Sequence, residues 1–290
     1  HNENGILTAN NGGTVRIDNS EFGYNGFGDG FSHNIYIGRV DSAIVRFSYF
    51  HHANVGHEFK SRARVNYITC NRFSNEAAGN ASREIDLPNG GVSILISNII
   101  QQGANSENGN IVGYGLEGLV NAAPHVLYLI QNSFVNERSA GSFISANAGT
   151  SLLKVYNNIF AGPGSTLLFS GTATPDMASN ITAVDVSSLH FINAPAYDYH
   201  IGSNSPALNA GTAAGTAING ESLQAVFEYQ HPAAAVPRTN NGIADAGAHE
   251  AAAVVPVYFK SFNGILIVSG CKYNRTFYIN LFKNFKANAI

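Results

Sequence analysis

Short runs of alternating apolar and polar residues recur along the first half of the chain. Each run is about five residues long and rich in β-branched or aromatic side chains, which is typical of a half-buried strand. The same ending follows each run, with Ser or Asn, then any residue, then an apolar one. Its copies are Ser20-Glu21-Phe22, Ser48-Tyr49-Phe50, Asn71-Arg72-Phe73, Asn98-Ile99-Ile100, Asn132-Ser133-Phe134 and Asn158-Ile159-Phe160.

The spacing of these copies identifies the architecture. Successive copies are 28, 23, 27, 34 and 26 residues apart, and a second short strand is expected before each main run. Two or three short strands per unit, joined by turns of variable length, are typical of the coils of a parallel β-helix. A leucine-rich repeat would need a regular leucine lattice, and a propeller would need blades of about 40–50 residues. The sequence therefore predicts an all-β parallel β-helix with 23–34 residues per coil, and a β-sandwich is the alternative.

The chain divides into three parts. The regular coils are expected over residues 1–165, and irregular late coils with a closing segment over residues 166–254, which are rich in Ala, Gly, Pro and Thr. Residues 255–290 are expected to form a C-terminal tail. The recurring Asn is expected to bond neighbouring backbone at the bend of each coil, so it is interpreted as structural.

Composition restricts the function. Charged residues make up 12% of the chain, about half the usual ~25%, while Asn and Gly number 35 and 30. The formal net charge of −3 argues against a broad nucleic-acid-binding surface. The chain contains no run of ~18 apolar residues, so no membrane span is expected. We expect no nucleic-acid partner, and we expect a monomer.

The scarce charge is concentrated on neighbouring coils. Seven of the 16 Lys and Arg residues lie between positions 39 and 83. Side chains alternate along a strand and coils stack about 4.8 Å apart, so alignment of the first strands places Tyr36, Lys60 and Asp86 in one outward column. The same alignment predicts an outward column of Asn34, Glu58 and Glu84, with Arg62 on the opposite flank, His33, His57 and Arg83 at the strand starts, and Glu117 in a nearby glycine-rich loop.

This concentration of charge has two interpretations. Opposite charges on adjacent strands stabilise a solvent-facing ladder modestly. The equivalent positions in residues 110–115 and 142–147, however, are uncharged. That contrast favours a functional site, where perturbed pKa values are expected.

Residues 33–38, 56–63 and 85–91 resemble secreted bacterial right-handed parallel β-helix repeat proteins, a superfamily that includes pectate lyases, alginate lyases and chondroitinase-like enzymes. Residues 205–211 (SPALNAG) and 245–250 (DAGAHE) look like the signatures that often close such helices. The resemblance covers residues 1–250 and implies a right-handed helix that is secreted or held at the cell surface. Residues 255–262 look like the start of a Bacteroidetes-type C-terminal secretion-sorting domain, from which residues 265–290 depart.

The resemblance implies a carbohydrate-active protein, and first a polysaccharide lyase that cleaves a uronic-acid polymer by β-elimination. Lys60 is then the expected base and Arg62 the group that neutralises the sugar carboxylate or acts as acid. Tyr36 or His57 would assist proton transfer. The expected substrate contacts are His33, Asn34, Arg83 and Glu117. Glu58, Glu84 and Asp86 are candidate ligands for Ca²⁺, which prefers oxygen ligands, and no organic cofactor is expected.

Two other functions stay open. A glycoside hydrolase needs two carboxylates, about 5–5.5 Å apart for retention or about 6.5–9.5 Å apart for inversion. Glu58, Glu84, Asp86 and Glu117 could supply the pair, although the tandem-Asp signature of polygalacturonase-like β-helices is absent. A non-catalytic polysaccharide-binding or adhesive β-helix would instead use aromatic and amide side chains on a flat sheet, and the absence of Trp argues mildly against it.

Overall fold

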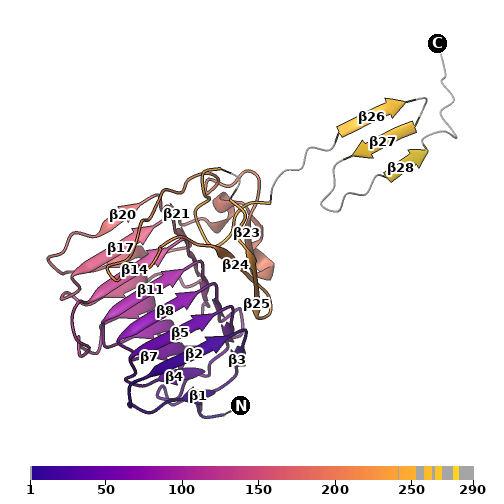
Figure 1. Cartoon of the computed structure of the whole chain (residues 1–290). Coiled ribbons are helices and arrows are strands. Elements are labelled where there is room, and N and C mark those ends of the chain that lie inside the picture. Colours follow the sequence, from indigo (N-terminus) through magenta and orange to yellow (C-terminus); the bar gives the residue numbers. More distant parts are fainter. Residues whose placement is uncertain (1, 241, 253–257, 263–264, 270–276, 281–290) are drawn as a thin grey trace. The chain divides into compact units, whose positions relative to one another are not determined.

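The strands between Ile6 and Ala183 form a parallel β-solenoid. The computed structural model describes residues 2–240, 242–252, 258–262, 265–269 and 277–280, and the chain divides into two units, residues 1–251 and 252–290. The first unit has about six turns of about 27 residues each, stacked one above the next (Figure 1). The predicted parallel β-helix is therefore confirmed.

Three sheets run the length of the solenoid, and each takes one strand from every coil. Sheet A contains β1 (Ile6–Leu7), β4 (Ile35–Ile37), β7 (His57–Ser61), β10 (Arg83–Leu87), β13 (Asn110–Tyr114), β16 (Ser142–Ala146) and β19 (Ser165–Leu168). Sheet B contains β2 (Thr14–Asp18), β5 (Ser42–Arg46), β8 (Val65–Thr69), β11 (Val92–Ile96), β14 (Val126–Ile130), β17 (Leu152–Tyr156) and β20 (Asp176–Ala178). Sheet C contains β3 (Glu21–Gly23), β6 (Tyr49–His51), β9 (Arg72–Ser74), β12 (Ile99–Gln102), β15 (Ser133–Asn136), β18 (Ile159–Ala161) and β21 (Ile181–Ala183).

The core is a stack of apolar side chains between the three sheets. In sheet A, Phe59, Ile85, Val112 and Ile144 pair in register and are fully buried. Alternation along the strands predicts this inward position, because Phe59 and Ile85 directly precede Lys60 and Asp86 of the outward column. Each such side chain contributes roughly 1.5–3 kcal/mol by leaving water, so the register and the core stabilise each other.

An asparagine ladder joins successive coils at the turn from sheet B to sheet C. The side-chain oxygen of Asn132 accepts hydrogen bonds from the backbone N–H and the side-chain amide of Asn98, at 3.0 and 2.9 Å. The Asn132 amide in turn donates to the carbonyl of Leu95 and to the side chain of Asn158, both at 3.0 Å. The same contacts repeat from Asn71 to Asn180. The predicted structural role of the recurring Asn is confirmed.

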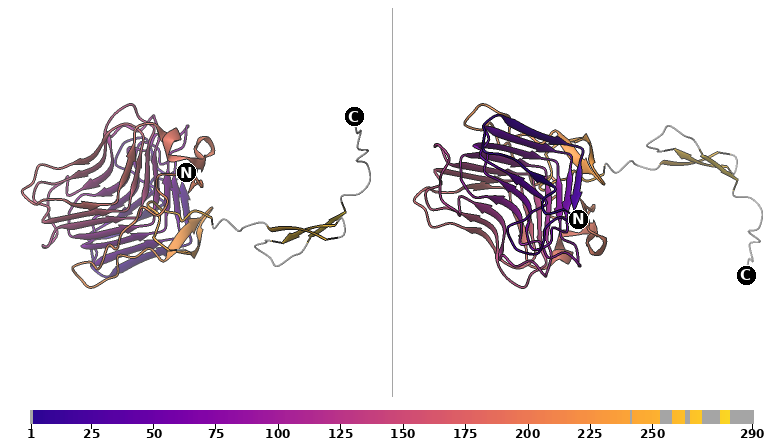
Figure 2. Two further views of the ribbon diagram at one scale, coloured as in Figure 1. Left: turned by 90° about the horizontal axis from the view of Figure 1, so that it is seen from above. Right: turned by 90° about the horizontal axis from the view of Figure 1, so that it is seen from below.

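The residue before each ladder position makes the turn in a left-handed backbone conformation. Its φ angle is 54° at Cys70, 59° at Ser97 and 52° at Gln131. This conformation costs a non-glycine residue roughly 1–2 kcal/mol, which the buried amide bonds of the ladder offset. The closing segment then covers this turn, because Cys70 and Ser97 both donate to the carbonyl of Phe227 and the chain runs along the stacked coils there (Figure 2).

The last part of the first unit leaves the repeat. The regular sheets continue through β21, beyond the expected limit of residue 165. After them come η1 (Val186–Leu189) and η2 (Ala194–Ala196), which are short 3-10 helices. Two antiparallel pairs follow the repeat, β22 (Phe191–Asn193) with β23 (Asp198–Ile201) and β24 (Phe227–Gln230) with β25 (Ala234–Pro237).

The second unit contains a three-stranded antiparallel sheet, formed by β26 (Tyr258–Phe262), β27 (Ile265–Ser269) and β28 (Phe277–Asn280). The stretch that resembles a secretion-sorting domain begins at residues 255–257, which lie outside the described residues. A secretion-sorting function of this stretch stays a prediction.

Replacement of one ladder residue tests the importance of the ladder. Asn132→Ala leaves the buried Leu95 carbonyl and the Asn98 N–H without their partners. Because each unsatisfied buried group costs about 1–3 kcal/mol, we expect the free energy of unfolding in urea to fall by about 3 kcal/mol. The control is Asn105→Ala, whose side chain makes one exposed bond and should change stability by less than ~0.5 kcal/mol. Equal losses in the two variants would contradict the structural role of the ladder.

Candidate functional site

Most of the charged side chains that the sequence singled out lie on the outer face of sheet A. Tyr36 pairs with Lys60, and Lys60 pairs with Asp86, on the neighbouring strands β4, β7 and β10. This register is the predicted outward column. Hydrogen bonds and ion pairs then join these three residues to side chains from the strand starts and the adjoining loops.

Asp86 is the central carboxylate of this face. Its side chain is only 2% exposed and contacts Arg83 Nη1 at 2.5 Å and Lys60 Nζ at 3.2 Å. His57 Nε2 lies 3.5 Å from the same carboxylate. A carboxylate this deeply buried is stable only with cationic or hydrogen-bonding partners, so Asp86 holds the two cations in place on the sheet.

Arg83 is held from several sides. Its Nε donates to Asn110 at 2.5 Å and its Nη2 to Asn108 at 3.3 Å. The guanidinium lies over Gly113 of the next coil, where a Cβ would come within 2.8 Å of Nη1. Asn108 and Asn110 were not predicted as site residues. Gly113 follows Tyr36, Lys60 and Asp86 in the outward column. Its lack of a side chain was the only sequence signal for the space that Arg83 occupies.

Glu117 provides the second carboxylate. Its Oε1 accepts from Lys60 Nζ at 2.5 Å, and its Oε2 accepts from Arg62 Nη2. Its side chain is 45% exposed, whereas that of Lys60 is 9% exposed. Glu117 belongs to the loop after β13. The backbone N–H of Glu117 donates to the carbonyl of Pro88, which attaches this loop to the preceding coil.

Arg62 and Tyr36 form the remaining part of the face. Arg62 Nε donates to the Tyr36 hydroxyl at 2.7 Å, and Nη1 donates to Asn89 at 2.7 Å. The Tyr36 ring lies 5.6 Å from the Arg62 guanidinium and 5.8 Å from Lys60 Nζ. The Tyr36 hydroxyl therefore bonds one cation directly, and its ring lies within cation–π distance of two.

The two histidines at the strand starts are uncharged near neutral pH. His33 and His57 stack with ring centroids 4.8 Å apart. Burial lowers the pKa of His33 to about 4. Burial, together with the neighbouring His33 and cations, lowers the pKa of His57 well below its ordinary value. The backbone N–H of His57 donates to His33 Nδ1, so the proton of neutral His33 is on Nε2.

The predicted outward column of Asn34, Glu58 and Glu84 is wrong. All three side chains are fully buried, in the corner between sheets C and A. Glu58 accepts from the Ala53 N–H at 3.0 Å and from the Asn34 amide, and Glu84 accepts from the Asn75 amide at 2.9 Å. Simple alternation fails here because the chain is turning into the strand, and Glu58 and Phe59 both point inward.

The predicted calcium ligands consequently do not form one set. Asp86 faces outward with its cations, whereas Glu58 and Glu84 lie in the interior. Within the described residues no group of three or more His, Cys, Asp or Glu side chains is placed to hold a metal ion. The burial of Glu58 and Glu84 also removes two of the four carboxylates that a hydrolase mechanism was expected to use.

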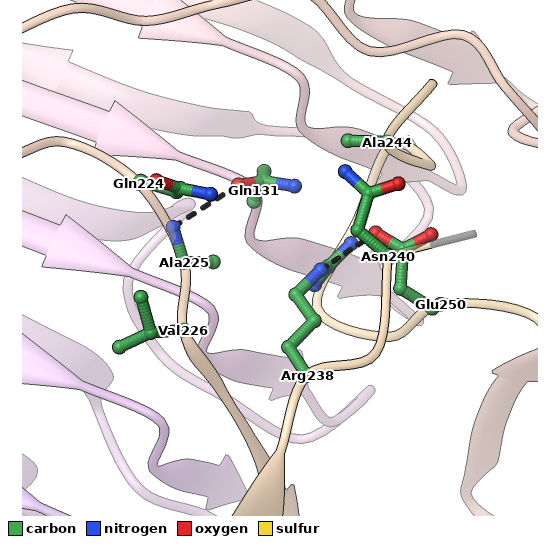
Figure 3. A pocket seen from close by; sticks show the side chains of 8 residues that line it. All are labelled: Gln131, Gln224, Ala225, Val226, Arg238, Asn240, Ala244 and Glu250. Atoms are coloured by element: carbon green, nitrogen blue, oxygen red, sulfur yellow. Dashed lines mark hydrogen bonds and ion pairs between the residues drawn. The ribbon is translucent and has the colours of Figure 1, made fainter. Parts of the chain in front are cut away.

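A separate pocket of about 120 Å³ lies against the closing segment (Figure 3). Several of its polar groups bond to one another or to nearby backbone. Arg238 donates to Glu250 and to the carbonyls of Gly247 and Asp245, and the Ala225 N–H donates to Gln131. These contacts attach the closing segment to the coils, so Arg238 has a structural role.

The comparisons with known proteins identified no family. No protein-family model, curated protein or solved structure matches the chain. None of the described helices is long and apolar enough to cross a membrane. The resemblance to β-helix enzymes is thus supported at the level of the parallel β-solenoid fold, and the activity must be argued from the site.

The buried Glu58 should make stability depend on pH. Burial raises its pKa from 4.5 to about 8, so between these values the folded chain retains a proton that the unfolded chain has lost. The free energy of unfolding should therefore fall as pH rises from about 4.5 to about 8 and then level off. Glu58→Gln should reduce this slope in urea unfolding measured across that range, whereas the exposed Glu107→Gln should not. An unchanged slope in Glu58→Gln would show that Glu58 is ionised in the folded chain.

The two carboxylates of the outer face should differ in their effect on stability. Asp86→Asn leaves Arg83 and Lys60 without a buried charge partner, and such a loss costs about 3–5 kcal/mol. Glu117→Gln removes a partly exposed carboxylate and should cost less than ~1 kcal/mol. Urea unfolding at pH 7 measures both. Similar values for the two variants would contradict the central role of Asp86.

Proposed function

We propose that the outer face of sheet A binds a uronic-acid polysaccharide and cleaves it by β-elimination. The observation that carries this proposal is the convergence of Lys60, Arg62 and Tyr36, which belong to adjacent coils and contact a shared carboxylate or one another. Such a set combines two cations with a phenol on an otherwise weakly charged chain. The proposal places the protein outside the cell or at its surface, where such polymers occur.

β-Elimination requires three functions, and this face has a group for each. Arg62 has the planar donor fork that pairs with a sugar carboxylate, and this pairing acidifies the adjacent C5–H bond. Lys60 is an ammonium in the resting site; after it has released one proton to solvent it takes the C5 proton, and the C5–H electron pair forms the C4–C5 double bond. The C4–O4 bond breaks, and the leaving oxygen takes the Tyr36 proton. Proton exchange with solvent then restores Lys60 and Tyr36.

The site is less suitable for hydrolysis. Of the four carboxylates considered for that mechanism, only Asp86 and Glu117 face outward, and both are already paired with cations. A general acid needs a raised pKa, whereas the pKa of Glu117 is lowered: burial opposes this, but hydrogen bonds from Lys60 and Arg62 outweigh it. Binding without catalysis uses the same cations and is separated from cleavage by the test below.

The test is a screen of acidic polymers, with and without a chelator. The folded chain is incubated with alginate, pectate, glucuronan and glycosaminoglycans, and ultraviolet absorbance of the unsaturated uronate product is followed. Lys60→Ala should reduce the rate at least 100-fold and Tyr36→Phe at least 10-fold, in line with the usual 10²–10⁴-fold contribution of a proton-transfer group.

The control is Lys154→Ala, which removes a cation from sheet B and leaves sheet A intact. It should retain the full rate. Reducing ends without ultraviolet absorbance would replace the lyase proposal with hydrolysis. Binding without any product across the panel would reduce the function to polysaccharide recognition, and full activity of Lys60→Ala would exclude Lys60 as the base.

A further inference from the structure

We infer that the carboxylate of Glu117 stands in for the carboxylate of the ligand, and that an incoming uronate replaces it between Lys60 and Arg62. This inference rests on the proposed binding of an acidic sugar. It adds that the site is specific for a carboxylate and that the chain carries its own competitor for it.

The first support is the geometry of the Glu117 carboxylate. One of its oxygens accepts from Lys60 Nζ and the other from Arg62 Nη2. A uronate carboxylate presents the same two oxygens, and a carboxylate shared between a guanidinium and an ammonium is the usual arrangement for recognising such a group. Glu117 therefore already demonstrates a carboxylate site of the right chemistry.

The second support is access. Lys60 is only 9% exposed, because Asp86 lies on one side and Glu117 on the other. Asp86 is 2% exposed and held by Arg83, whereas Glu117 is 45% exposed. Of these two carboxylates, only Glu117 can turn into solvent without breaking buried contacts, so a ligand reaches Lys60 through the position of Glu117.

The third support is that the loop stays anchored when the Glu117 side chain turns away. Leu119 packs against the backbone of Gly90, Gly115 and Gly149, where a Cβ would lie 2.6–2.7 Å from its methyl carbons. The Asn121 side chain donates to the carbonyls of Ala63 and Gly90, at 3.0 and 2.8 Å. Rotation of one exposed side chain is therefore enough to open the site.

The fourth support is the charge balance. Arg62, Lys60 and Arg83 bring three positive charges, and Asp86 and Glu117 bring two negative ones. The two stacked histidines are uncharged. Turning Glu117 outward leaves two uncompensated cations side by side, and a ligand carboxylate restores the original balance. A neutral sugar cannot do so, which is why the exchange selects uronates.

The experiment measures binding of free glucuronate and, as a neutral match, glucose to the full chain and to Glu117→Gln, by calorimetric titration at low salt. A competitor that occupies the site most of the time weakens the apparent affinity by the fraction of time that the site is free. Glu117→Gln should therefore bind glucuronate at least about tenfold more tightly than the unmodified chain, with no gain for glucose. Glu221→Gln, an exposed acid on another part of the surface, is the charge-matched control and should leave both affinities unchanged.

Glu117→Ala is the second variant. If competition is the cause, its affinity for glucuronate should rise as much as that of Glu117→Gln. Equal or weaker glucuronate binding by both variants, or no binding by any form of the chain, would overturn the inference. Tighter binding by the variants without product from any polymer would leave the carboxylate site standing and refute the lyase. Polymer cleavage by the unmodified chain without tighter binding by the variants would support the lyase and refute the exchange of Glu117 for a ligand.

Discussion

The stacking of each coil on the next in exact register is the constraint on which the rest of this molecule depends. Parallel strand pairs alone allow sliding along the strand direction. The asparagine ladder removes that freedom, because each buried side chain bonds the backbone of the preceding coil and the ladder side chain of the next coil at one fixed point. Once that point is set, every strand position of one coil lies above the same position of the coil before it.

The outer face of sheet A follows directly from this stacking. Tyr36, Lys60 and Asp86 are far apart along the chain but become neighbours because they occupy one position in three coils. The spacing of coils, about 4.8 Å, is close to the reach of an ion pair. A solenoid can therefore assemble an acid–base cluster from one substitution per coil, without any change in the fold.

Two carboxylates of different exposure balance the cations of this face. Asp86 is buried and holds Arg83 and Lys60 to the sheet, while Glu117 is exposed and closes the cluster from outside. The first contact belongs to the stability of the coils, and the second can be exchanged for a ligand. Burial keeps His33 and His57 uncharged beside these cations, so they add no repulsion.

Sequence reasoning succeeded in the middle of the strands and failed at their starts. The inward column of Phe59, Ile85 and Val112 and the outward column of Lys60 and Asp86 are both as expected. Glu58 and Glu84 were expected outside, because strict alternation was extended into the corner. There the backbone is changing direction, and amide groups from the preceding turn accommodate the carboxyl groups inside.

The sequence by itself determined the repeat, the coil length, the ladder and the strip of sheet on which charge gathers. These features depend on local periodicity and on the recurrence of one residue type at one position, and both can be read along the chain. Only the tertiary structure decided which partner each charge takes. Lys60 and Glu117 are 57 positions apart, and their contact depends on how a loop folds back over the preceding coils and on how deeply each group is buried, which no pattern along the chain records.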